Sequence, residues 1–90
     1  MITIKENKFG VFKDVFENEL LPTDSIVILF EEQTTKKKTY KLVNFETFDN
    51  WIQIELPEIK KGFYYISLYA CFDPDVIEDY LFLYKEQIDI

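Results

Sequence analysis

The sequence predicts one mainly β domain over residues 1–90, with about six antiparallel strands folded into a sandwich or a small barrel. Of its 90 residues, 48% are hydrophobic and 18% aromatic, which is too apolar for a disordered chain and enough for a small core. Several short runs alternate between apolar and polar residues and are joined by short polar segments. Antiparallel strands can follow one another through such segments, whereas parallel strands need longer crossovers, usually helical.

The N-terminal third has the weakest pattern. Ile2 and Ile4 predict a short first strand. The next large apolar residues recur near the helical period, at Phe9, Phe12, Phe16 and Leu20. Residues 11–20 therefore predict either a short helix or an irregular strand, and the spacing favours the helix.

A β-hairpin is predicted next. Residues 26–32 (IVILFEE) form a β-branched apolar run, and residues 39–43 (TYKLV) form a second strand. The polar segment 33–38 joins them and carries three consecutive lysines at 36–38, near the expected tip. A solvated tip is the expected role of these lysines, and charged tips also discourage edge-to-edge aggregation.

The following segment, 51–56 (WIQIEL), is typical of a half-buried strand. Its aliphatic residues Ile52, Ile54 and Leu56 alternate with Trp51, Gln53 and Glu55. Pro57 lacks the amide hydrogen that a ladder would need, so the strand is expected to end there.

Residues 63–71 (FYYISLYAC) and 80–86 (YLFLYKE) predict two further strands, separated by a turn at Asp73-Pro74-Asp75. Each has an aliphatic face and an aromatic face. If the two strands pair as a hairpin, five aromatic residues lie on one side of the sheet: Tyr65, Tyr69, Tyr80, Phe82 and Tyr84. Two interpretations stay open, an inner wall of the sandwich or a protein interface, where tyrosine is enriched.

We predict that the residues that bind a partner are Trp51, Tyr65, Tyr69, Tyr80, Phe82 and Tyr84. Stacking of a sugar on Trp51 and neighbouring tyrosines is a further alternative. The acidic group Asp73, Asp75, Glu78 and Asp79 lacks the glycine and terminal glutamate of a calcium-binding loop, so a solvated turn is expected there.

No catalytic site, metal or cofactor is predicted. The chain contains no histidine, which is the commonest general base and metal ligand. The only cysteine, Cys71, lies on a predicted strand without a base to activate it, so we expect a small buried side chain. A single cysteine also excludes an internal disulfide.

The charge argues against direct binding of nucleic acid. The formal net charge is −7, and all ten basic residues are lysines. Nucleic acid would repel such a chain, although acidic proteins can occupy a nucleic-acid channel on another protein. No apolar stretch approaches the ~18 residues of a membrane span, and no signal peptide is visible, so production in a reducing cytoplasm is expected.

The order of these motifs over residues 24–90 resembles a group of small β-sandwich proteins of Bacteroidota phages, including crAss-like phages. The matching motifs are IVILFEEQTTKKKTYKL, WIQIEL ending near Pro57, KGFYY at 61–65, and a closing strand at 76–84. The family has a glycine before that strand, where this chain has Asp79 and Tyr80. The resemblance implies an immunoglobulin-like virion component, attached to capsid or tail.

The first functional hypothesis is therefore a non-enzymatic structural or accessory protein of a phage virion, with other virion subunits as partners and self-association as an option. Two alternatives remain. One is a small acidic inhibitor of a host nucleic-acid-binding enzyme, which the net charge suggests. The other is a carbohydrate-binding module, which Trp51 and the neighbouring tyrosines suggest.

Overall fold

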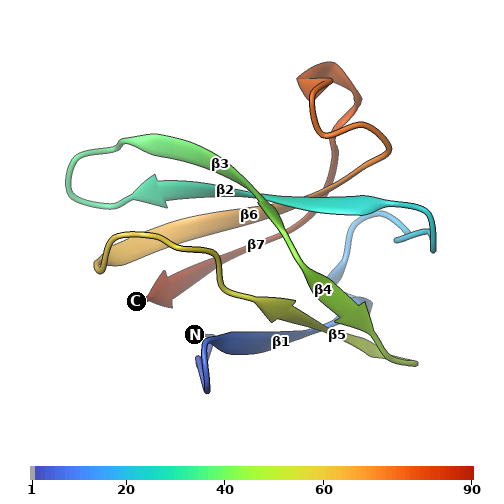
Figure 1. The fold of residues 1–90 in the computed structure, drawn as a ribbon, viewed down its shortest axis with the longest axis horizontal. Helices are drawn as coiled ribbons and strands as arrows, with labels where there is room; N and C mark the ends of the chain where they lie inside the picture. Colours follow the sequence, from blue (N-terminus) through green and yellow to red (C-terminus); the bar gives the residue numbers. More distant parts are fainter. Residues whose placement is uncertain (1) are drawn as a thin grey trace.

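The computed structural model describes residues 2–90, and within them seven strands form two antiparallel sheets (Figure 1). The three-stranded sheet contains, in spatial order, β1 (Lys8–Phe12), β5 (Trp51–Glu55) and β4 (Phe45–Thr47). The four-stranded sheet contains β3 (Lys38–Val43), β2 (Ser25–Glu32), β6 (Phe63–Cys71) and β7 (Leu81–Asp89). With 52% of residues in strands and a sandwich-like arrangement, the predicted mainly β fold is confirmed.

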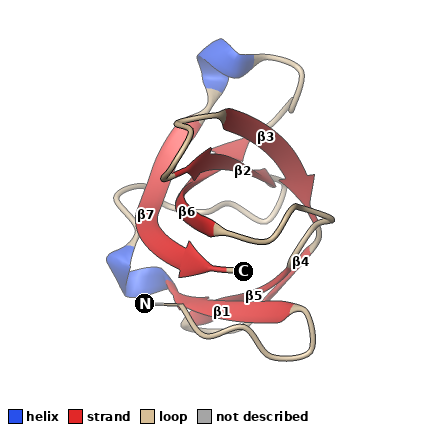
Figure 2. Cartoon of the chain, turned by 90° about the vertical axis from the view of Figure 1, so that its left-hand side faces the viewer, coloured by secondary structure: helices blue, strands red, loops and turns tan. Residues whose placement is uncertain are grey.

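One bent segment joins the two sheets. β3 pairs with β2, and after Asn44 the chain continues directly as β4, which pairs with β5 (Figure 2). At this corner the amide of Glu55 donates a hydrogen bond of 2.9 Å to the Asn44 carbonyl. Strands that change sheet at a bend make the corners of orthogonally packed sandwiches. The sequence pattern did not predict the short strand β4.

The strand order can be compared with that of an immunoglobulin constant domain, which also divides seven strands between sheets of four and three. In that domain the second strand shares a sheet with the first, fourth and fifth strands. Here β2 lies between β3 and β6 instead. The sandwich layout is therefore shared, and the two folds differ in the sheet to which the second strand belongs.

The core fills the space between the sheets. Alternate residues of β2, β5 and β6 face inward with no exposed surface or almost none, among them Ile26, Ile28, Phe30, Ile52, Ile54, Ile66 and Leu68. The ring of Phe30 meets that of Tyr64 edge to face, with 5.8 Å between centroids. The Tyr64 hydroxyl donates to the Lys60 carbonyl at 2.6 Å, so this buried tyrosine keeps a polar partner.

The N-terminal prediction was wrong in both parts. The first strand is β1, not the segment containing Ile2 and Ile4, although both isoleucines pack against the core. The predicted helix over 11–20 reduces to one 3-10 turn, η1 (Lys13–Val15). The reason is tertiary: Phe9 and Val11 alternate into the core opposite β5, and this pairing prevails over a weak helical spacing.

The remaining strand predictions agree with the structure to within a few residues. The β2–β3 hairpin has Lys36 at its tip, with a φ of 62°, and the Glu32 amide donates to the Lys37 carbonyl. β7 begins one residue later than predicted and extends to Asp89. A second 3-10 turn, η2 (Ile77–Asp79), lies in the connection before it.

Candidate functional site

A β-bulge between β6 and β7 divides the predicted aromatic face. Leu68 lies opposite Tyr84, but the next residue, Tyr69, lies opposite Phe82. Leu83 therefore has no residue of β6 opposite it. Residues directly opposite in an antiparallel pair point to the same side of the sheet. Tyr84 therefore lies with Leu68 on the inner side of the four-stranded sheet, which faces the core. The prediction that Tyr84 lies beside Tyr69 and Phe82 was wrong. An extra residue in one strand reverses the alternation beyond it.

The outer side of the four-stranded sheet carries a cluster of aromatic rings. The Tyr69 ring lies 5.8 Å from both the Tyr80 and the Phe82 rings, measured between centroids. Tyr80 also meets Tyr40 edge to face at 5.9 Å. Three of the predicted residues are thus brought together, and Tyr40 of β3 joins them. The alternation of Tyr40 and Leu42 in the TYKLV strand was the sequence signal for this position.

Aliphatic residues continue this cluster across the sheet. Val27 lies opposite Leu42 on one side and Tyr69 on the other, and it is almost fully buried. Leu42 is 60% exposed and Tyr40 is 45% exposed. We call the surface made by Tyr40, Leu42, Tyr69, Tyr80 and Phe82 the outer aromatic face. It is a packed cluster with an exposed apolar edge on β3.

Tyr80 is fixed in this face by the connection that precedes β7. Its hydroxyl donates to the Pro74 carbonyl, and the Asp75 amide donates to the Asp73 carboxylate at 3.0 Å. Burial raises the pKa of the Tyr80 hydroxyl, and nearby groups including Cys71 and Asp75 raise it further. The hydroxyl therefore stays protonated and remains a donor at neutral pH.

The other two predicted partner-binding residues lie apart from the outer aromatic face. Tyr65 is half-buried further along β6, where the Lys85 ammonium sits 5.6 Å from its ring centroid. Trp51 belongs to the three-stranded sheet. Its ring stacks on Phe48 with 4.4 Å between centroids and 9° between planes. The indole therefore has one face already occupied.

Gly10 of β1 lies under the same indole. A Cβ atom at this position would stand 3.0 Å from Cε3 of Trp51, closer than side chains normally approach. Glycine therefore lets the large ring lie flat against the neighbouring strand. Trp51 thus packs against its own sheet, on the other side of the molecule's core from the tyrosines.

Cys71 is buried, as the sequence predicted, with 2% of its surface exposed. Burial raises the pKa of its thiol, and the charges of Asp24 and Asp73 raise it further. A protonated, inaccessible thiol is a poor nucleophile. Among residues 2–90, no group of three or more histidine, cysteine, aspartate or glutamate side chains is arranged to hold a metal ion.

Within the described part of the chain, no helix has the length and apolar character needed to cross a membrane. Comparison with known proteins gives no match to any protein-family model, to any curated protein sequence or to any solved structure.

Proposed function

We propose that this chain is a non-enzymatic domain that binds a neighbouring protein in an assembly through its outer aromatic face. The observation that carries the proposal is the exposed apolar edge of that face at Tyr40 and Leu42, continuous with packed rings behind it. Contiguous exposed apolar surface on a soluble domain commonly marks an interaction site.

The order of the cluster favours this use. The Tyr69 and Tyr80 rings are held by each other and by the Tyr80 hydrogen bond to Pro74. Side chains that are already ordered lose little conformational entropy when a partner binds. Tyrosine also combines a large contact area with a hydroxyl that can bond at the rim of an interface.

The resemblance to small β-sandwich proteins of Bacteroidota phages supplies the setting of the proposal. In that setting the chain is a capsid or tail component of a virion, made in the host cytoplasm, and its partners are other virion subunits. Binding through a packed surface suits such a role, because contacts in a virion form between folded subunits and require no catalysed reaction.

A non-enzymatic role is supported by the available side chains. The sequence contains no histidine, and Cys71 is buried with a raised pKa. A carbohydrate-binding role is less favoured, because Trp51 stacks on Phe48 and is on the other sheet from the tyrosines. Inhibition of a nucleic-acid-binding enzyme rests on the net charge of −7, which no observed contact adds to among residues 2–90.

The test uses paired substitutions on the two sheets. The variant Tyr40→Ser with Leu42→Ser removes the exposed edge of the outer aromatic face. The variant Phe48→Ser removes an aromatic side chain of similar exposure, 41%, from the turn between β4 and β5 of the other sheet. Each variant is used to capture virion proteins from purified particles, and circular dichroism checks that each one folds.

We expect the wild-type chain and Phe48→Ser to retain the same virion subunit, and the double variant to lose it by at least tenfold in affinity. Retention by the double variant would show that another surface makes the contact. If no virion subunit binds the wild-type chain, the proposed setting is wrong.

A further inference from the structure

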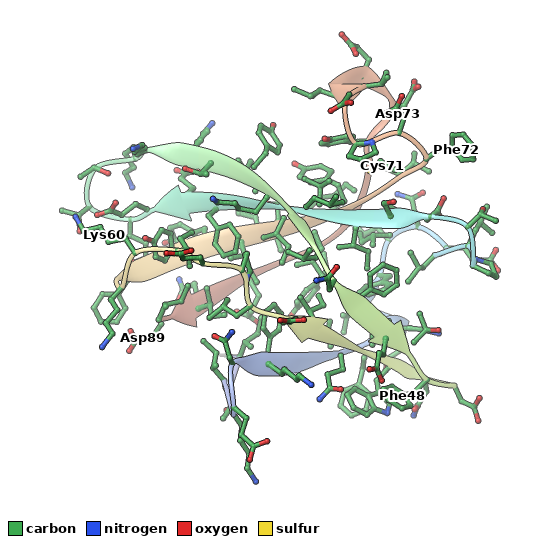
Figure 3. All side chains as sticks on the ribbon, viewed as in Figure 1. Phe48, Lys60, Cys71, Phe72, Asp73 and Asp89 are labelled. Atoms are coloured by element: carbon green, nitrogen blue, oxygen red, sulfur yellow. The ribbon has the colours of Figure 1, made fainter. Side chains whose placement is uncertain are left out.

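One end of the molecule is rich in lysine, although Asp89 and Ile90 also lie there, and the other end carries an acidic connection. β2 and β6 pair along their length, with Ser25 opposite Cys71 at one end and Glu32 opposite Tyr64 at the other. The lysine-rich β2–β3 tip and the β5–β6 connection with Lys60 are therefore at one end. The acidic connection between β6 and β7 is at the opposite end, and Figure 3 shows Lys60 and Asp73 far apart along the longest axis, which extends 33 Å.

The acidic end presents an exposed aromatic side chain. We call residues 72–79 the acidic loop; it contains the carboxylates of Asp73, Asp75, Glu78 and Asp79. Phe72, at its start, is 82% exposed, and Ile77 is 56% exposed. In Figure 1 this loop projects beyond the sheets. Exposure of a phenylalanine on a projecting loop is unfavourable in water, so a partner that covers it would gain stability.

The basic end contains an open cavity of about 230 Å³. Its apolar lining comes from Ile59 and the Tyr64 ring, and its charged lining comes from Lys37, Lys41, Lys60, Glu32 and Glu58. A cavity of about 150 Å³ can hold a benzene molecule, so this one has room for a phenylalanine ring. Three ammonium groups against two carboxylates leave its rim positive, and Lys36, Lys38 and Lys61 lie next to these residues in the chain.

We propose that copies of this chain associate head to tail, with the acidic loop of one copy in the basic cavity of the next. Phe72 enters the cavity, and Asp73 and Asp75 face Lys37 and Lys60 of the second copy. The contact joins two different surfaces, so it can extend into a ring or a filament. The inference goes beyond the proposed function and uses surfaces separate from the exposed edge at Tyr40 and Leu42.

Salt should affect this contact in a defined way. The facing charges attract, but two copies with a net charge of −7 each also repel as whole molecules. Exposed charges are screened beyond ~8 Å at physiological ionic strength, which weakens the long-range repulsion while adjacent pairs still interact. The contact is therefore tested near physiological salt.

The test measures the solution mass by sedimentation velocity over a concentration series, using two variants. The loop variant carries Phe72→Ser and Asp75→Lys, which leaves its cavity intact. The cavity variant carries Lys37→Glu and Lys60→Glu, which leaves its acidic loop intact. All four positions are exposed, so both variants should fold and melt like the wild type, which circular dichroism verifies.

We expect the wild-type mass to rise with concentration and each variant alone to remain a monomer. An equimolar mixture should form a heterodimer that does not grow further. The intact loop of the cavity variant fills the intact cavity of the loop variant, and no second intact pair is left. A wild-type chain that stays monomeric at every concentration, or a folded mixture that does not pair, would overturn the proposal.

Variants that oligomerise like the wild type would also overturn it, because another surface would then be responsible. The Tyr40→Ser, Leu42→Ser variant should self-associate normally here. Its result therefore separates failure of the head-to-tail contact from failure of the outer aromatic face.

Discussion

The two sides of β6 show how one strand can serve both the fold and its surface. On the inner side Ile66 and Leu68 are completely buried between the sheets. On the outer side Tyr65 and Tyr69 are half-buried, and Tyr69 packs against the neighbouring rings of Tyr80 and Phe82 on the same surface. The inner side is thus covered by a second sheet, whereas on the outer side the connection before β7 holds Tyr80 through its bond to Pro74.

The difference follows from the chemistry of the two residue types. Aliphatic side chains have no polar atom, so complete burial costs them no hydrogen bond. A tyrosine needs a partner for its hydroxyl and is stable where the ring is covered and the hydroxyl is accessible. Tyr64, the one tyrosine on the inner side of β6, meets this need through the Lys60 carbonyl, and burial together with Glu32 raises its pKa.

The largest expected effect comes from the inner side. Ile66→Ala should lower the free energy of unfolding by about 2–5 kcal/mol, because it removes buried methylene groups and leaves a cavity. Tyr65→Ala, one residue away on the outer side, should cost about 1 kcal/mol, since its ring is only partly covered. Urea unfolding followed by fluorescence measures both. Equal losses would mean that the outer side is as tightly packed as the inner side.

The next effect concerns Tyr84, the aromatic residue that the bulge transfers to the inner side. Its hydroxyl donates to the Glu86 carboxylate at 2.7 Å. Burial, and then this carboxylate, raise the pKa of Tyr84 to about 12, whereas the pKa of Glu86 is lowered by its backbone hydrogen bond from Gln87 and by Tyr84. Tyr84→Phe should cost about 1.5 kcal/mol at pH 8, because it removes a hydrogen bond to a charged group in a partly buried site.

The same pair gives a dependence on pH. The pKa of Tyr84 is higher in the folded chain than its unfolded value near 10, so its contribution is complete below about pH 10 and is lost as the pH rises toward 12. Glu86 contributes above its unfolded pKa, and that contribution is lost as the pH falls through its lower folded value. The urea concentration at the unfolding midpoint should fall between pH 8 and 12, and it should fall less steeply in Tyr84→Phe than in the wild type. An unchanged slope would show that groups other than Tyr84 cause the alkaline loss.

The smallest expected effect concerns the outer side. Tyr80→Phe keeps the ring between Tyr40 and Tyr69 but removes the hydrogen bond to Pro74, at a cost of about 1 kcal/mol. Loss of this bond should also speed hydrogen exchange at the amides of Val76 and Asp79, which donate within the same connection. Unchanged exchange at both amides would show that the backbone bonds alone hold the connection.

The sequence alone was sufficient for the fold class and for the faces of individual strands. Alternation in residues 51–56 correctly placed Ile52 and Ile54 together on one face, which the structure buries. In residues 63–71 alternation grouped Ile66 with Leu68, but the sequence left open which face of that strand is buried, and the structure buries this one. This succeeds because successive side chains in a strand point to opposite sides, and the apolar side must be covered. The same local rule could not decide which strands would become neighbours.

The tertiary structure decided the features that depend on those neighbours. Pairing with β5 made residues 8–12 a strand despite their helical spacing, and the bulge at Leu83 moved Tyr84 away from Phe82. Tyr40 joined the outer aromatic face because β3 and β7 lie on either side of β2 and β6. Each outcome depends on contacts between residues far apart in the chain. Periodicity shows only which residues of one segment lie on the same side of it, and not which other segment that side will contact.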